Sequence, residues 1–269
     1  MLSDITLGQY YPTESFVHKL DPRVKILLLI AFVTAVFLAG NLTALLPVAL
    51  YVALCSYMSR LPAKMLIRNV RSLRFILIFT FLLNVFFMSG ETVILEWGFL
   101  RITLEGLKSA VLYSARLLLL VIGSSLLTLS TPPVVLTDGL ERLLSPLRVI
   151  HFPVHELAMM MTIALRFIPT LLEEADKIMQ AQKARGADFE SGNLLKRAKA
   201  MVPLLVPLFV SAFRRAGDLA MAMEARCYHG GEGRTRLRVL RCTWRDAAAA
   251  LMTAVLVFLA VLLSRVSPV

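Results

Sequence analysis

Long apolar runs separated by short polar segments fill the first half of the chain and predict membrane-spanning helices. The first run, residues 26–39, is extended by Lys25, whose aliphatic stem can reach the interface, so it approaches the ~20 residues of a bilayer span. Gly40 and Asn41 interrupt it, and a second run, residues 42–58, follows at once. We expect a helical hairpin with both ends on one side of the membrane.

A basic amphipathic segment follows this hairpin. Residues 60–74 contain no acidic residue, and apolar residues separate their five cations: Arg60, Lys64, Arg68, Arg71 and Arg74. Such a segment is typical of a short helix along anionic headgroups on the cytoplasmic face, which places the amino terminus in the cytoplasm as well. Residues 75–88 form the third predicted span, and the acidic stretch 89–105 is expected outside.

A fourth predicted span, residues 107–129, contains Arg116 well inside its apolar sequence. An arginine there costs ~2.5 to 3.5 kcal/mol on insertion scales, so it either has a function or faces other helices and pairs with them. Prolines at 132–133 end the span. Asp138 is then expected to cap a short amphipathic helix that ends near Pro146.

Apolar residues recur every three or four positions from residue 153, which predicts a long amphipathic helix over about 153–186. Pro169 should kink this helix. A polar turn leads to a second long helix, about 194–228, whose apolar run 201–213 is too short and too broken by prolines for a span. The recurring positions form one mostly apolar face of the first helix: Leu157, Met160, Ala164, Phe167, Leu171, Ala175, Ile178 and Gln182.

Between Glu173 and Arg245, 14 basic residues outnumber 8 acidic ones, which places both long helices in the cytoplasm. A last apolar run, 247–263, carries the carboxyl terminus outside. The sequence therefore predicts an all-α, polytopic membrane protein with about five spans and two long cytoplasmic helices. We expect three parts: a membrane domain over residues 1–130, a cytoplasmic domain over 131–245 and a final transmembrane helix over 246–269.

Composition supports this class. Hydrophobic residues make up 58% of the chain and charged residues 17%, with a mean hydropathy of +0.73, which is too apolar for a soluble domain. The net charge of +11 suits cytoplasmic loops better than nucleic-acid binding. Cys55, Cys227 and Cys242 share no spacing typical of a disulfide framework or metal site. The mostly polar first 23 residues do not resemble a signal peptide.

Few residues suggest catalysis. The sequence has no Gly-x-x-x-x-Gly-Lys-Ser/Thr loop, so the chain itself is not expected to hydrolyse ATP or to hold a cofactor. The glycines within 230–233 resemble a phosphate loop only loosely, and an ordinary loop is favoured. His151 and His155 are four apart, but Pro153 lies between them and no carboxylate and cysteine set completes a metal site. We favour a structural histidine pair.

One pattern, Ala-x-x-Ala-Arg-small, ends both long helices, at 181–186 and 41 positions later at 222–227. A single arginine before glycine is an ordinary helix end, favoured by the dipole and by glycine's left-handed conformation. Two copies favour docking, because small residues admit a partner and a guanidinium offers a planar fork to carboxylates or carbonyls. The candidate docking residues are Ala184, Arg185, Gly186, Ala225, Arg226 and Cys227.

These residues resemble the transmembrane T component of energy-coupling factor transporters, ABC importers for vitamins and transition-metal ions. The likeness spans nearly the entire chain. Besides the two arginine triplets, it includes Leu20-Asp21-Pro22-Arg23-Val24-Lys25, Leu136-Thr137-Asp138-Gly139-Leu140, Leu165-Arg166-Phe167-Ile168-Pro169 and Gly230-Gly231-Glu232-Gly233-Arg234-Thr235.

The resemblance implies a non-catalytic subunit in the cell membrane of a prokaryote. Its two long coupling helices cross, and each arginine triplet docks in a groove of one of two ABC ATPases, which bind ATP and Mg. A small membrane subunit, the S component, holds the substrate. Cys227 replaces the glycine of the strict triplet, as in T components that serve several S components. Which vitamin or ion is imported, and which arginine meets which ATPase, stays open.

The sequence also allows two other classes. A polytopic membrane enzyme would use Arg116, His151, His155 and Glu156 as its active groups. A conventional ABC permease would bind substrate itself and couple through one short helix, whereas this chain has a pair of long ones.

Overall fold

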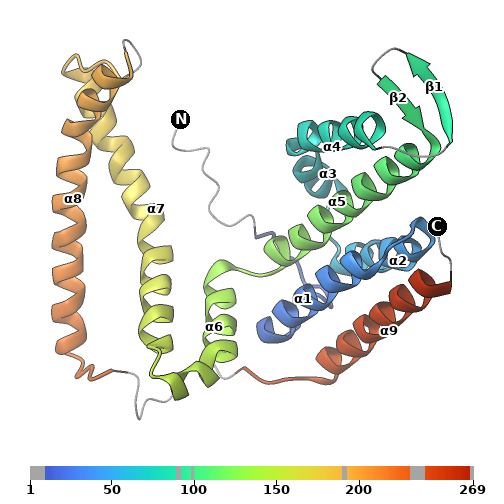
Figure 1. Cartoon of the computed structure of the whole chain (residues 1–269). Coiled ribbons are helices and arrows are strands. Elements are labelled where there is room, and N and C mark those ends of the chain that lie inside the picture. Colours follow the sequence, from blue (N-terminus) through green and yellow to red (C-terminus); the bar gives the residue numbers. More distant parts are fainter. Residues whose placement is uncertain (1–9, 89–91, 98–99, 190–192, 231–239, 267–269) are drawn as a thin grey trace. The chain divides into compact units, whose positions relative to one another are not determined.

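Helices make up nearly all of the described chain, which comprises residues 10–88, 92–97, 100–189, 193–230 and 240–266 of a computed structural model (Figure 1). The α-helices are α1 (Pro22–Leu38), α2 (Leu42–Ser59), α3 (Ala63–Ser72), α4 (Arg74–Phe87), α5 (Leu104–Ser130), α6 (Pro133–Leu144), α7 (Val154–Ala184), α8 (Leu194–Glu224) and α9 (Trp244–Val266). A 3₁₀ helix, Ser145–Ile150, follows α6. For the described residues, the expected all-α class is confirmed.

One described segment departs from this class. Strands β1 (Val93–Trp97) and β2 (Leu100–Thr103) pair antiparallel where the sequence predicted only an acidic outside loop. The β1 sequence, Val-Ile-Leu-Glu-Trp, is rich in the branched and aromatic residues that favour strands. This strand could therefore have been predicted from the sequence.

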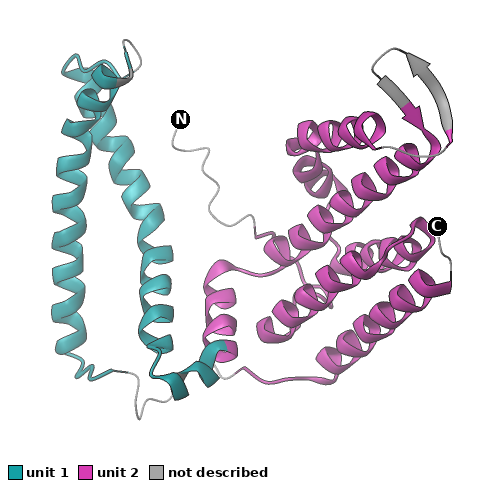
Figure 2. Cartoon of the chain, in the orientation of Figure 1, with its two compact units in different colours: residues 1–7, 144–238 teal, residues 8–143, 239–269 magenta. Residues whose placement is uncertain are grey.

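The chain folds into two units (Figure 2). The insertion unit contains the described residues from 144 to 230, and therefore α7 and α8. The membrane unit contains the described residues from 10 to 143 together with 240–266, and therefore the other α-helices. In sequence, the first unit is inserted between α6 and α9 of the second.

The core of the membrane unit lies among α1, α2, α5 and α9. The last helix in sequence, α9, packs against the first two, and α4 packs along α5. Gly123 lets α5 pack closely against α1, because a Cβ at this position would overlap the ring of Phe32 on α1. The buried apolar cluster consists of Phe32, Ala35, Val36, Ala39, Ala44, Leu45, Val48, Val52, Leu119, Leu256 and Ala260.

Five described helices are long and apolar enough to cross a membrane: α2, α5, α7, α8 and α9. Three of them match predicted spans. The other two predicted spans are short, with 17 residues in α1 and 14 in α4, although α4 together with α3 forms a further candidate bent by 58°. The chain is thus a multi-pass membrane protein. α7 and α8 are the least apolar of the five, and their charged residues lie among the apolar ones.

The local predictions around α5 and α6 had mixed outcomes. α5 ends at Ser130, before the two prolines, as expected. α6 begins at Pro133, so Asp138 lies inside this helix and the prediction that Asp138 caps it was wrong. Proline suits the first helical position, because its missing N–H would have no intrahelical partner there.

α7 and α8 form an antiparallel pair of 31 residues each, joined by residues 185–193 (Figure 1). Glu174 of α7 accepts a hydrogen bond from Arg215 Nη2 of α8 at 2.9 Å. α7 ends two residues before the predicted boundary at 186, and α8 ends four residues before the predicted boundary at 228. Pro169, like the two prolines of α8, lies inside its helix.

Candidate docking sites

The first arginine triplet caps the C-terminus of α7. The Arg185 amide donates to the Gln182 carbonyl at 3.1 Å, and the Gly186 amide donates to the Lys183 carbonyl at 3.0 Å. The Ala187 amide then reaches back to the Gln182 carbonyl at 3.0 Å, while Gly186 has a φ of +87°. This is a Schellman arrangement, in which a left-handed residue lets the chain satisfy the last helical carbonyls.

The second triplet closes α8 with the same three hydrogen bonds. The amides of Arg226 and Tyr228 both donate to the Met223 carbonyl, at 3.1 and 3.0 Å, and the Cys227 amide donates to Glu224 at 2.8 Å. Cys227 has a φ of +55° and therefore occupies the position that glycine holds in α7. This conformation costs a residue with a Cβ roughly 1 to 2 kcal/mol.

All six predicted docking residues are exposed. Around Gly186 the surface is open, since a Cβ at this position would meet no atom within 4 Å. Neither Arg185 nor Arg226 forms an ion pair within the described part of the chain. The caps therefore hold the backbone of each triplet in place and leave its guanidinium available to a partner.

The two triplets lie at opposite ends of the α7 and α8 pair. Arg185 follows the end of α7, whereas Arg226 follows the end of α8, which lies beside the start of α7. A helix of this length extends about 45 Å at ~1.5 Å per residue. One partner protein at each end would therefore contact one triplet.

A cavity of about 400 Å³ lies beside the second triplet. Its walls come from the start of α7, the end of α8 and the residues behind α8: Met159, Ile163, Leu219, Met223, Arg226, Cys227, Tyr228, His229 and Gly230. Arg226 thus stands at the edge of a largely apolar hollow, while the surroundings of Gly186 are open. The two sites share a backbone geometry but offer a partner different surfaces.

Arg116 pairs with its neighbours inside the membrane unit. Its Nη2 donates to the carbonyl of Ala39, the residue that follows α1, at 2.7 Å. Its guanidinium also lies 6.0 Å from the ring centre of Phe37 and 5.4 Å from that of Tyr113. Of the two interpretations left open by the sequence, these contacts support pairing between helices.

The other candidate active groups belong to a different unit from Arg116. His151 precedes α7 with a φ of +58°, and His155 and Glu156 lie in the first turn of α7, so all three belong to the insertion unit. Among the described residues, no three His, Cys, Asp or Glu side chains are close enough to share a metal ion. Gly231, Glu232, Gly233, Arg234 and Thr235 lie outside the described residues.

Two other motifs from the sequence meet in the membrane unit. Asp21 caps α1 by accepting from the Arg23 amide at 2.9 Å, and it pairs with the Arg23 guanidinium at 2.9 Å. Burial raises the pKa of Asp21, but hydrogen bonds from Arg23 outweigh burial and lower that pKa overall. Gly139 of the second motif lies so close that a Cβ there would approach Pro22 Cβ to 3.0 Å.

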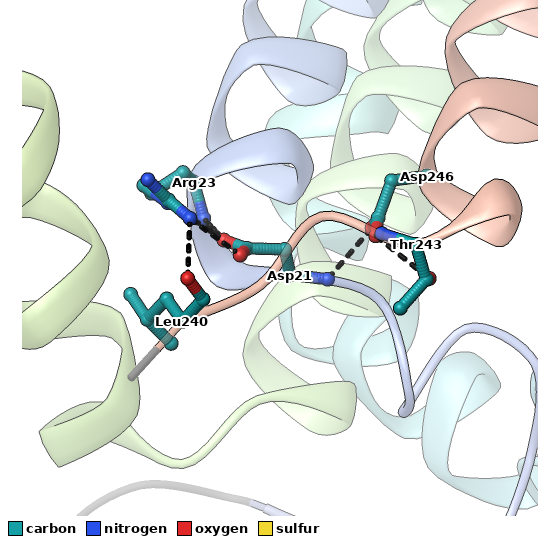
Figure 3. Close-up of polar contacts among 5 residues, drawn as sticks. All are labelled: Asp21, Arg23, Leu240, Thr243 and Asp246. Carbon is teal, nitrogen blue, oxygen red and sulfur yellow. Dashed lines mark hydrogen bonds and ion pairs between the residues drawn. The ribbon is translucent and has the colours of Figure 1, made fainter. Parts of the chain in front are cut away.

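Sequence reasoning missed two residues of this cluster, Thr243 and Asp246 (Figure 3). Asp246 Oδ2 accepts from the Thr243 amide at 2.7 Å and from its hydroxyl at 2.9 Å, while Oδ1 accepts from the Asp21 amide at 2.8 Å. The spacing Thr-x-x-Asp just before an apolar run is a capping-box signature. That signal would have placed the start of α9, although not its contact with Asp21.

Comparisons with known proteins agree with this architecture. The model of the CbiQ family, described as cobalt transport protein, matches residues 13–237. A protein from Thermosediminibacter oceani is 54% identical over 255 residues, which cover 95% of this chain and 96% of the relative. One from Brevibacillus brevis is 51% identical over 260 residues, which cover 96% and 97%. Both relatives are named energy-coupling factor transporter transmembrane protein EcfT. The chain therefore belongs to this family of transport proteins, as a transmembrane component of the energy-coupling factor type.

Proposed function

We propose that this chain is the non-catalytic coupling subunit of an ATP-driven importer of vitamins or other micronutrients. It transmits the motion of two ABC ATPases to a small membrane S component that binds the substrate. The observation that carries the proposal is the pair of identical helix caps, each with an exposed arginine, at opposite ends of α7 and α8. If one ATPase binds at each end of the α7 and α8 pair, each ATPase groove needs its own arginine triplet, which explains why the chain contains two copies.

The mechanism needs no catalytic residue in this chain. ATP and Mg bind to the ATPases, and ATP binding brings the two ATPases together. Each groove carries its arginine with it, so the ends of α7 and α8 are displaced and the membrane helices rearrange around the S component. Such a cycle requires only that the partners bind the two conformations of this chain with different affinities.

The S component would contact the apolar surface of α8. Seven of its apolar side chains between 201 and 213 are 45 to 74% exposed: Met201, Val202, Leu205, Val206, Phe209, Val210 and Phe213. An exposed apolar surface of this kind marks contact with protein or membrane. The partly buried face of α7, from Leu157 to Ile178, is the second candidate.

We propose the cell membrane of a prokaryote as the location, with the amino terminus in the cytoplasm. The basic residues of α3 and the excess of basic residues around α7 and α8 both support this orientation. The arginine triplets would then face the compartment that contains ATP.

The test is a double charge reversal. Arg185→Glu together with Arg226→Glu should abolish co-purification with both ATPases and abolish uptake, because a carboxylate replaces the fork that binds groove acceptors. The matched control, Lys177→Glu with Arg214→Glu, makes the same charge change at exposed sites on the same helices. Membrane insertion is checked in both variants. Retained assembly and uptake in the double arginine variant would refute the proposal.

A further inference from the structure

The residues at the start of α1 hold both chain segments that lead to the insertion unit. By sequence, the membrane unit connects to α7 through α6, and it resumes after α8 with the chain that continues at Leu240. Both segments belong to the membrane unit, and both contact the segment from Asp21 to Lys25. Every displacement that passes from the insertion unit along the chain must pass through one of them.

The incoming segment is bound by Lys25 and packed on Pro22. Lys25 Nζ donates to the Ser130 carbonyl at 3.2 Å and to Thr131 Oγ1 at 2.9 Å, where α5 gives way to α6. One turn and a half into α6, Gly139 lies against Pro22 without room for a side chain. The start of α6 is therefore held at two places.

The outgoing segment is bound by Arg23 and Asp21 (Figure 3). Arg23 Nη2 donates to the Leu240 carbonyl at 3.1 Å and also to Asp21 Oδ2 at 2.9 Å. The Asp21 amide donates to Asp246, which caps α9. One arginine thus joins the cap of α1 to the chain that returns from α8.

These contacts are suited to transmitting force. The Asp21 side chain is 1% exposed and the Arg23 side chain 27%, so water competes little for their hydrogen bonds. The planar guanidinium reaches a carboxylate and a carbonyl in fixed directions, a geometry that the point charge of a lysine does not reproduce.

We propose that Arg23 is a positioning residue of the transport cycle. With Asp21 it fixes the outgoing segment against α1, to which the incoming segment is already bound. Motion of α7 and α8 then moves α1 and α9 and is not lost in the connecting segments. This inference rests on the proposed coupling function and adds the place where coupling enters the membrane helices.

The first experiment separates ATP hydrolysis from transport in the reconstituted complex. Arg23→Lys keeps the charge and should still assemble with the ATPases and hydrolyse ATP. Uptake per ATP should fall about tenfold, the factor that corresponds to loss of one hydrogen bond to a charged group. Lys19→Gln is the control, because it removes the exposed pair Lys19–Glu14 (2.8 Å), which holds neither segment.

The second experiment observes the outgoing segment directly. Cys242 is exposed and lies two residues beyond Leu240, so it accepts a spin label once Cys55 is replaced by serine and Cys227 by glycine, the residue at the equivalent position of the first triplet. The label should become more mobile in Arg23→Lys and remain unchanged in Lys19→Gln. Gly139→Ala, which displaces Pro22 from the side of α6, should lower uptake per ATP in the same way.

Three results would overturn the proposal: unchanged label mobility, unchanged uptake per ATP, or loss of folding in both the Arg23→Lys and Gly139→Ala variants. Different results would show that the proposed coupling function itself is wrong. In that case the unmodified complex would show no ATP-dependent uptake, or the double arginine variant of α7 and α8 would still assemble, whatever happens at Arg23.

Discussion

Gly186 and Cys227 occupy equivalent positions in the two helix caps, and both have a positive φ, +87° and +55°. Glycine adopts this conformation without steric cost, whereas the Cβ of cysteine meets the neighbouring carbonyl. The second cap therefore keeps its hydrogen bonds at an energetic cost that the first cap does not have. The end of α8 should open more readily than the end of α7.

We predict that Cys227→Gly stabilises the end of α8. Glycine removes the strain of the left-handed conformation, but it also has greater freedom in the unfolded chain. The difference stabilises the helix end by about 0.5 to 1 kcal/mol. Hydrogen–deuterium exchange of the Tyr228 amide, which donates to Met223, should slow about two- to fivefold. Gly186→Ala is the converse control and should speed exchange at Ala187, since its Cβ meets no neighbour and only backbone strain changes. Faster exchange in Cys227→Gly would contradict the prediction.

Residues that repeat or cap can be recognised from sequence, but their partners cannot. The two arginine triplets were identifiable because they recur with the same spacing on consecutive helices. Arg116 could be recognised as a charged residue inside an apolar span, yet its hydrogen-bond acceptor, Ala39, lies 77 residues away in the sequence. The contact of Asp21 with Asp246 spans 225 residues, and no local pattern encodes it.

Small residues determine how closely the helices of the membrane unit pack. Gly123 faces the ring of Phe32, which is 3% exposed and stacks on Tyr51 at a centroid distance of 6.1 Å. In a bilayer, packing contacts of this kind replace the hydrophobic effect as the force between helices. The contact between α1 and α5 should therefore be sensitive to a single methyl group.

We predict that Gly123→Ala destabilises the membrane unit by about 1 to 3 kcal/mol, because the added Cβ forces the Phe32 ring out of place. The unfolding midpoint in detergent should fall by roughly 3 to 10 °C. Phe32→Leu in the same chain should restore part of the loss. Gly217→Ala on α8 is the control, because a Cβ there meets nothing within 4 Å and alanine favours a helix. An equal fall in both variants would exclude this packing explanation.

Helix positions followed from periodicity, whereas helix environments did not. Mean apolarity groups α7 and α8 with the membrane helices, although their charged residues and the basic excess around them support the cytoplasmic location that we propose for them. Average hydropathy ignores which face a residue occupies, so a long amphipathic helix and a span can have similar values. The error at Asp138 came from a capping signal that lies inside α6, because this helix already begins at Pro133.

The order of the helices along the chain determines where motion of α7 and α8 can reach the membrane unit. α9 follows α8 in sequence but packs with α1 and α2, so the insertion unit interrupts the sequence of one helical core. Its two arginine triplets are at opposite ends of α7 and α8, about 45 Å apart by helix length. The antiparallel pair therefore separates the two candidate docking sites enough for two partners.

We predict that each triplet holds its own ATPase. In the absence of ATP, when the ATPases are not drawn together, Arg185→Glu alone should release one ATPase and Arg226→Glu alone should release the other. Native mass spectrometry of the purified complexes gives the count, and the masses of the retained subunits show which arginine binds which ATPase. Arg214→Glu, an exposed arginine of α8 outside both triplets, should retain two. If either single substitution released both ATPases or neither, the two sites would not act independently, and a shared binding surface would have to replace the model of one groove at each end.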